Sequence, residues 1–266
     1  MEFMTIRDVR AAMASMMTVC GVLLAAACGP VRADDSAAVD TALILAVDVS
    51  NSVDATRYKL QMEGIAQALE DKGVIDAITS GPAGGIALSV VTWADHAHVP
   101  VPWRIIRSGA DAISFAALVR QLPQTTGEYT CMARMLEMTR QTIVPDIPVK
   151  AARVVLDVSG DGIDNCSPPD ETGTERDALV AAGVTINGLP IIVKGENEIV
   201  GSGAYRAPGY GLRELPKGPD SATTTLDAWY SANLIGGTGA FLLKANGFED
   251  FGRAFRQKFV SEISMK

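Results

Sequence analysis

The sequence predicts a doubly wound α/β fold, in which a mostly parallel central sheet carries helices on both faces. Short runs of apolar and β-branched residues, such as 43–47 and 153–158, have the continuous hydrophobicity of strands buried on both sides. These runs alternate with longer segments in which apolar residues recur every three or four positions, as in amphipathic helices. No internal repeat or linker interrupts the alternation, so residues 34–266 are expected to form one domain.

The elements follow from these patterns in chain order. A strand at 43–47 precedes a helix at 55–72, which Gly73 is expected to end. A strand at 86–93 precedes an edge strand at 98–103, because the prolines in that segment cannot donate hydrogen bonds to a central ladder. The remaining expected elements are helices at 110–122, 132–143, 175–182, 225–234 and 248–263, and strands at 153–158, 184–193 and 240–244.

The composition excludes several classes of protein. Of the 266 residues 48% are hydrophobic, which is enough for a buried core. The 31 Asp and Glu residues outnumber the 23 Lys and Arg residues, and the net charge is -8, which argues against binding to nucleic acid. His96 and His98 are the two histidines, which leaves little material for a histidine-rich zinc site or for a triad with a remote histidine.

Residues 1–33 have the pattern of an export signal. Arg7 and Arg10 precede an apolar stretch at 11–28, and small residues lead to Ala33, after which we expect cleavage. Two alternatives remain open, because the stretch is close to the minimum length of a membrane anchor and because Cys28 lies in a weak lipobox. Each outcome places the folded part outside the cytoplasm, as a periplasmic or secreted protein.

One carboxylate and two hydroxyls follow the first predicted strand. Asp48, Ser50 and Ser52 are spaced by two along a turn, so their oxygen atoms can converge on one point. Oxygen donors suit hard divalent cations such as Mg²⁺, and neutral hydroxyls leave such a site with waters and an open position. The structural alternative is that Ser52 or Asp54 caps the helix that follows.

Two further segments strengthen the metal interpretation. The strand at 153–158 runs into Asp161, and in a doubly wound sheet this strand should lie beside the first one, which brings Asp161 near Asp48. Thr130 precedes another helix and offers a hydroxyl. A calcium-binding EF-hand loop that starts at Asp157 is disfavoured, because its twelfth position, which needs a bidentate glutamate, is Pro168.

Together these residues resemble the metal-ion-dependent adhesion site of von Willebrand factor A domains, over nearly all of the chain after the signal. Segments 159–165 and 230–241 also resemble an exported bacterial family, domain of unknown function 1194. A family member often has a hydrophobic residue and Thr where this chain has Ser159 and Gly160, but the aspartate and the following glycine are present.

The resemblance implies a Rossmann-like von Willebrand factor A fold and a role for each residue of the motif. Ser50, Ser52 and Thr130 would bind the ion directly, and Asp48 and Asp161 would hold it mainly through water. The implied cofactor is Mg²⁺, with Mn²⁺ or Ca²⁺ as alternatives. The implied partner is a protein whose carboxylate completes the coordination.

Two cysteines, Cys131 and Cys166, remain after the signal. An even pair in an oxidising compartment favours one disulfide over two buried thiols. Because the resemblance brings Thr130 and Asp161 to the same ion, we expect this disulfide to clamp the rim of the site.

The segment 194–219 is rich in Gly and Pro and should leave the sheet on the metal face. It is either an inert insertion or a partner-binding loop, whose contact residues would be Tyr205, Arg206, Tyr210 and Arg213.

Three functions compete. The first is an exported protein-binding module without catalysis, which touches a membrane only through a lipid or an N-terminal anchor. The second is a periplasmic metal-dependent hydrolase that uses Asp48. Phosphatases of similar topology need a second Asp where this chain has Ser50, and neither a G-x-S-x-G elbow nor a P-loop lysine is present. The third is a domain that keeps the fold and has an idle site.

Overall fold

A five-stranded sheet forms the centre of the computed structural model, which describes residues 38–201 and 223–264. Its strands, in the order β3-β2-β1-β4-β5, are β1 (Val39–Asp48), β2 (Ile86–Trp93), β3 (Ala97–Ile106), β4 (Ala151–Gly160) and β5 (Val184–Pro190). Four strands are parallel, and β3 runs antiparallel at one edge. The predicted doubly wound, mostly parallel sheet is confirmed.

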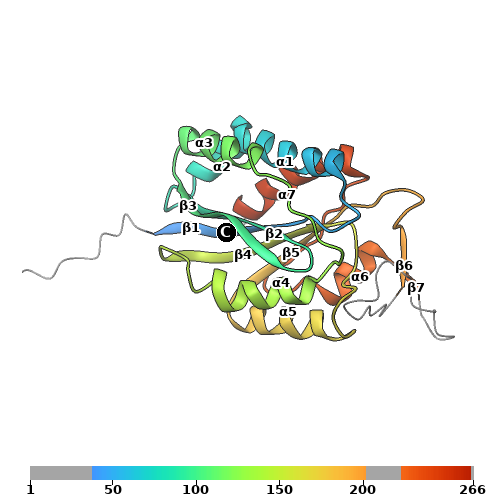
Figure 1. The fold of residues 1–266 in the computed structure, drawn as a ribbon. Coiled ribbons are helices and arrows are strands. Elements are labelled where there is room, and N and C mark those ends of the chain that lie inside the picture. The colour runs from blue at the N-terminus through green and yellow to red at the C-terminus, as the bar shows by residue number, and fades with distance from the viewer. Residues whose placement is uncertain (1–37, 202–222, 265–266) are drawn as a thin grey trace, which may run out of the picture. The chain divides into compact units, whose positions relative to one another are not determined.

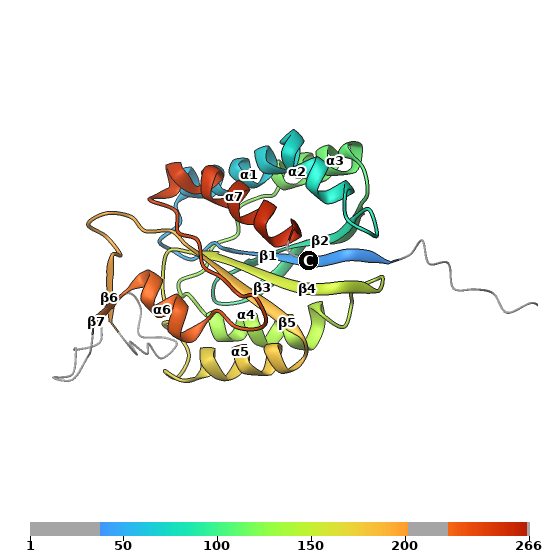
Figure 2. The ribbon, with the colours of Figure 1, turned by 180° about the vertical axis from the view of Figure 1, so that it is seen from behind.

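Helices cover both faces of this sheet (Figures 1 and 2). One face carries α1 (Ala55–Glu70), α2 (Lys72–Thr79), α3 (Gly109–Arg120) and α7 (Phe251–Ser264), and the other carries α4 (Met132–Met138), α5 (Glu171–Ala181) and α6 (Leu226–Asn233). Side chains of β1 alternate between the two layers, with Leu43 and Leu45 in the first and Ile44 and Ala46 in the second. The unbroken apolar run of β1 therefore reflects burial on both faces.

The predicted first helix at 55–72 forms as α1, and aspartate caps begin both this helix and the second one that follows it. Asp54 accepts the backbone N–H groups of Thr56 and Arg57 and so begins α1. Asp71 has an extended backbone that ends α1, and its side chain accepts the N–H groups of Gly73 and Val74 to begin α2. The expected end at Gly73 was therefore wrong, because Gly73 lies inside the first turn of a second helix.

The C-terminal part differs more from the prediction. The expected strand at 240–244 is reduced to isolated parallel bridges beside β5, between Gly188 and Leu242 and between Ile191 and Ala245. An unpredicted pair of short strands, β6 (Ile199–Gly201) and β7 (Thr223–Thr225), precedes α6. A π-helix, η2 (Thr139–Ile143), continues α4, and a 3-10 turn, η3 (Phe248–Asp250), precedes α7.

A buried cluster of charges joins α7 to the sheet. The Lys258 ammonium forms ion pairs with Asp157 of β4 and with Glu262, and all three side chains are buried. Asn187 of β5 donates to Glu262 at 2.9 Å. Burial and then repulsion from Asp157 raise the pKa of Glu262 to about 8. This cluster fixes the position of α7 against two strands, whereas the sequence pattern indicated only an apolar stripe on that helix.

In the part of the chain that the structure describes, no helix is both long enough and apolar enough to cross a membrane.

Candidate metal centre

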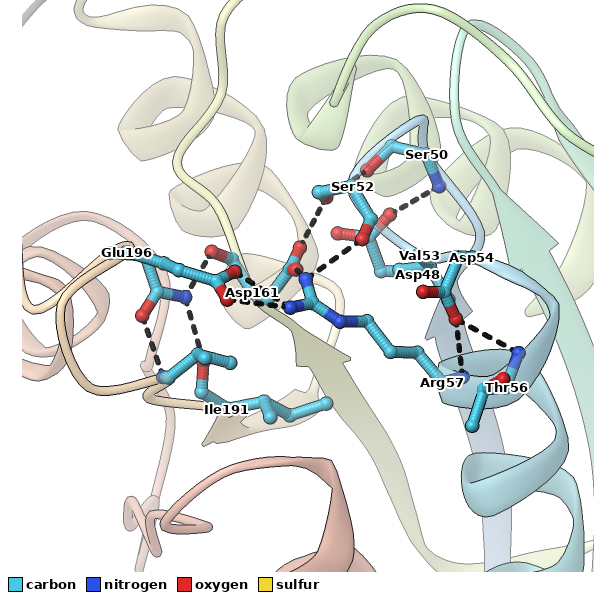
Figure 3. A network of polar contacts seen from close by, with 12 residues as sticks. Asp48, Ser50, Ser52, Val53, Asp54, Thr56, Arg57, Asp161, Ile191 and Glu196 are labelled. Atoms are coloured by element: carbon cyan, nitrogen blue, oxygen red, sulfur yellow. Dashed lines mark hydrogen bonds and ion pairs between the residues drawn. The ribbon is translucent and has the colours of Figure 1, made fainter.

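Three turns meet at the carboxyl end of the sheet. Because β1 and β4 pair in parallel, the turns that carry Ser52 and Asp161 emerge side by side. Ser52 Oγ donates to Asp161 Oδ1 at 2.6 Å. Ser50 Oγ lies 3.3 Å from Ser52 Oγ and accepts from Thr130 Oγ1 at 3.3 Å. The structure therefore brings together the side chains that the sequence proposed as metal ligands. Figure 3 shows Ser52, in the turn after β1, directed toward Asp161, in the turn after β4.

The carboxylate of Asp48 lies beneath these hydroxyls. It is fully buried, and its Oδ1 accepts the backbone N–H of Ser50 at 2.8 Å. Its Oδ2 has no hydrogen-bond partner among the described residues. Burial and then repulsion from Asp161 raise the pKa of Asp48 to about 8, and burial also raises the pKa of Asp161. Two neighbouring buried carboxyl groups of this kind are stabilised in their ionised form by a cation.

The donors present fit a divalent cation. Within residues 38–201 and 223–264 no group of three or more His, Cys, Asp and Glu side chains could hold a metal ion, so hydroxyl groups must contribute. Ser50, Ser52 and Thr130 supply three, and every donor is an oxygen, which suits a hard ion such as Mg²⁺. Ser52 is exposed, so one side of the site opens to solvent. The partnerless Asp48 oxygen is an observation that a bound ion or its waters would account for.

The Thr130 side of the centre is held by covalent and backbone contacts. Cys131 and Cys166 form a disulfide, as expected. The Thr130 N–H donates to Asn165 Oδ1 at 2.9 Å, and the Asn165 N–H donates to the Thr130 carbonyl at 3.2 Å. Asp164 accepts the N–H of Ala133 at 2.7 Å, in the first turn of α4. These contacts fix the Thr130 hydroxyl relative to the turn that carries Asp161.

The opposite side is held by an ion pair that the sequence did not predict (Figure 3). Arg57 Nη1 donates to the Ser52 carbonyl at 3.0 Å and lies 3.7 Å from Asp161 Oδ2. Arg57 Nη2 donates to both carboxylate oxygens of Glu196, at 2.8 and 2.7 Å. Asn197 donates to the Asp161 carbonyl at 2.6 Å. Arg57 follows Ser52 by five positions, so the sequence could have indicated a contact between Arg57 and the serine motif. No local pattern in the sequence indicated Glu196 or Asn197.

Some predicted features lie outside the described residues. The four expected partner contacts, Tyr205, Arg206, Tyr210 and Arg213, fall within 202–222. The predicted signal, its cleavage after Ala33 and the lipidation alternative at Cys28 fall within 1–37.

Comparison with solved structures identifies the fold. Proximal thread matrix protein 1 from the mussel byssus superposes with a TM-score of 0.56 and 18% identity, covering 86% of this chain and 47% of that one. Another structure of the same protein has zinc in its MIDAS motif, the metal-ion-dependent adhesion site (TM-score 0.54, 17% identity, coverage 85% and 46%). This chain thus spans about half the length of the mussel protein.

Two bacterial structures agree. BatB from Bacteroides thetaiotaomicron has a TM-score of 0.52 at 15% identity, covering 85% of this chain and 98% of that one. A von Willebrand factor type A protein from Catenulispora acidiphila has a TM-score of 0.52 at 17% identity, covering 85% and 43%. These likenesses show the von Willebrand factor A fold.

Sequence comparison gives the family. No curated protein matches significantly. The model of a family described as protein of unknown function (DUF1194) matches residues 38–266. Because this match covers every described element, the chain belongs to the DUF1194 family and has the von Willebrand factor A fold.

Proposed function

We propose that this protein is an exported, non-catalytic binding module that engages an acidic group of a protein partner through a divalent cation. The observation that carries the proposal is the convergence of Ser50, Ser52, Thr130 and Asp161 above the buried Asp48. The disulfide supports export, because disulfides persist in oxidising compartments.

The charge balance supports an acidic partner. Asp48 and Asp161 together neutralise a divalent cation, while the hydroxyls add no charge, so the ion keeps its affinity for an anionic ligand. Arg57 adds a positive charge beside Asp161. We propose Mg²⁺ as the ion, with Mn²⁺ or Ca²⁺ as alternatives. The zinc found in the mussel protein's site supports a divalent ion at this place in the fold.

Burial argues against a hydrolase in which Asp48 is the nucleophile. A nucleophile must be reached by its substrate, but Asp48 is fully buried, and one of its oxygens is already bonded to the Ser50 N–H. Ser50 also occupies the position at which phosphatases of similar topology place a second Asp. We therefore give the binding function precedence.

Metal binding is the first test. After treatment with EDTA, Mg²⁺ or Mn²⁺ at about 100 times its Kd should stabilise the purified protein by about 2.7 kcal/mol, seen as a rise in Tm. Asp48→Ala should show no rise. Asp54→Ala is the matched control, because it removes the helix cap and about 1 kcal/mol of stability but should keep the metal-dependent rise. If the native protein shows no rise at millimolar metal, the metal interpretation is wrong.

The partner is the second test. Capture of one protein from envelope extracts by the native protein, and its loss with EDTA or in Asp48→Ala, would support the binding function. Turnover of phosphate or ester substrates that disappears in Asp48→Ala would instead support the hydrolase.

A further inference from the structure

Two buried oxygen atoms beside the metal centre have no hydrogen-bond partner among the described residues. They are Oδ2 of Asp48 and the hydroxyl of Tyr230, and both residues are fully buried. Both atoms face Gly160, since a methyl group placed there would lie 2.8 Å from the Asp48 oxygen and 2.9 Å from the Tyr230 oxygen. The Asp48 oxygen accepts and the Tyr230 hydroxyl donates, so one buried water between them, or a small shift that brings them into contact, satisfies both. The second lone pair of the Asp48 oxygen then stays available to a bound ion or its waters.

The surroundings of Tyr230 hold its ring in this place. Tyr230 lies on α6, which covers the same face of the sheet that receives the side chain of Asp48. The ring packs over Gly188 of β5, where a methyl group would lie 3.1 Å from a ring carbon. After α6 the chain returns to this strand, and the Ile186 N–H donates to the Gly236 carbonyl at 2.8 Å. The ring is therefore fixed between the helix and β5.

We propose that Tyr230 is a positioning residue of the metal centre, whose hydroxyl donates to Asp48 Oδ2 directly or through one buried water. The inference rests on the proposed function. A carboxylate whose second oxygen is held in this way keeps its first oxygen on the Ser50 N–H and its orientation toward the cation site. It also gives Tyr230 a role that the serine motif does not explain, and it explains the need for glycine at position 160.

Trp93 is the competing donor. Its indole N–H is also buried without a partner in the described residues, and Trp93 lies opposite Asp48 in the register of β1 and β2. Tyr230 is preferred because its hydroxyl and the Asp48 oxygen are the two atoms nearest to a methyl group placed at Gly160, and no atom of Trp93 lies as near.

The experiment measures the Kd for Mn²⁺ by calorimetry, and Tm in EDTA, for the native protein and for Tyr230→Phe. Loss of an outer hydrogen bond to a metal ligand weakens binding by about 10- to 100-fold, so we expect at least a tenfold rise in Kd. The metal-free Tm should also fall, because the buried Asp48 oxygen loses its hydrogen-bond donor, so the Kd and not the Tm is the deciding measurement. A purely structural tyrosine would lower Tm and leave Kd unchanged.

Tyr58→Phe is the matched control. The Tyr58 hydroxyl is bonded to the carbonyls of Leu122 and Pro123, both at 3.2 Å. This variant should lower Tm without changing the Kd for Mn²⁺. If Tyr230→Phe does not fold, Gly160→Ala replaces it, since the added methyl group separates the same two oxygens and should weaken Mn²⁺ binding to a similar degree.

Each outcome decides the matter. An unchanged Kd in Tyr230→Phe, or in the Gly160→Ala variant that replaces it, overturns the role of Tyr230 and leaves the proposed function standing. A Kd that rises in Trp93→Phe but not in Tyr230→Phe assigns the donor to Trp93 and also overturns the role of Tyr230. A native protein that binds no Mn²⁺ overturns the proposed function, and the inference falls with it.

Discussion

Replacing Lys258 with methionine would leave two buried carboxylates beside each other without a cation. The side chains of Lys258 and Glu262 are 0% exposed and that of Asp157 is 2% exposed, so water cannot replace the missing charge. Methionine preserves the length of the apolar stem. Removing one partner of a buried ion pair typically costs about 3–5 kcal/mol, because the remaining charge stays buried and unpaired.

We expect Lys258→Met to lose about 3–5 kcal/mol of unfolding free energy, measured by urea denaturation at about pH 8. The loss should shrink at about pH 5, because the pKa of Glu262, raised to about 8 by burial and by repulsion from Asp157, then leaves that carboxyl group uncharged. Lys72→Met is the control. Lys72 pairs with Asp76 on the surface, with side chains that are 87% and 60% exposed, and such pairs contribute roughly 0.3–0.5 kcal/mol.

A loss in Lys258→Met no larger than that in Lys72→Met would refute this reasoning. It would mean that the Lys258 ammonium does not stabilise the native protein by compensating charge on Asp157 and Glu262. A large loss that is the same at both pH values would assign the effect to packing of the stem.

Three further predictions follow from other parts of the molecule. Replacing both Cys131 and Cys166 with serine opens a loop with a sequence separation of 35 residues and should cost about 3–4 kcal/mol in urea denaturation, as should reductant on the native protein. The metal-free protein should lose stability as pH rises from about 5 to about 8, because native Glu262 and Asp48 hold protons that the unfolded chain has released; Glu262→Gln should remove the share of Glu262 from this slope in a pH series of melts and leave that of Asp48. Glu196→Gln should weaken Mn²⁺ binding roughly threefold to tenfold in calorimetry, because Arg57 then pairs with Asp161, while Glu198→Gln, which alters the same loop, should not.

The convergence of the candidate ligands could be predicted because it depends on topology alone. Parallel strands end at one edge, so the turns after residues 48 and 160 meet wherever β1 and β4 are neighbours. The disulfide was expected from the even pair of cysteines and from the family resemblance, which places Thr130 beside Asp161, since sheet topology alone does not place Thr130.

Contacts that depend on side-chain reach between distant segments could not be predicted. Arg57 and Glu196 are separated by 139 positions, and a helical pattern shows only that Arg57 is polar. Lys258 and Glu262 likewise have the spacing of a surface pair, and only the register of α7 against β4 shows that they are buried. The segment expected as a strand at 240–244 does run beside β5, where the Leu243 N–H donates to the Gly188 carbonyl at 3.1 Å, but it pairs there only through isolated bridges, and a short apolar run does not show how far such pairing extends.

The two sides of the candidate metal centre differ in how they would respond to the proposed partner. The Thr130 side is fixed by a disulfide and by buried hydrogen bonds, which neither salt nor an acidic ligand displaces. The other side depends on the pair of Arg57 and Glu196, whose side chains are 23% and 53% exposed, and an exposed pair is screened by salt. An acidic partner that reaches the ion can therefore compete with Glu196 for Arg57. We expect its affinity to fall with rising salt in the native protein and to lose most of that salt dependence in Arg57→Met, whereas equal salt dependence in both would place Arg57 outside the partner interface.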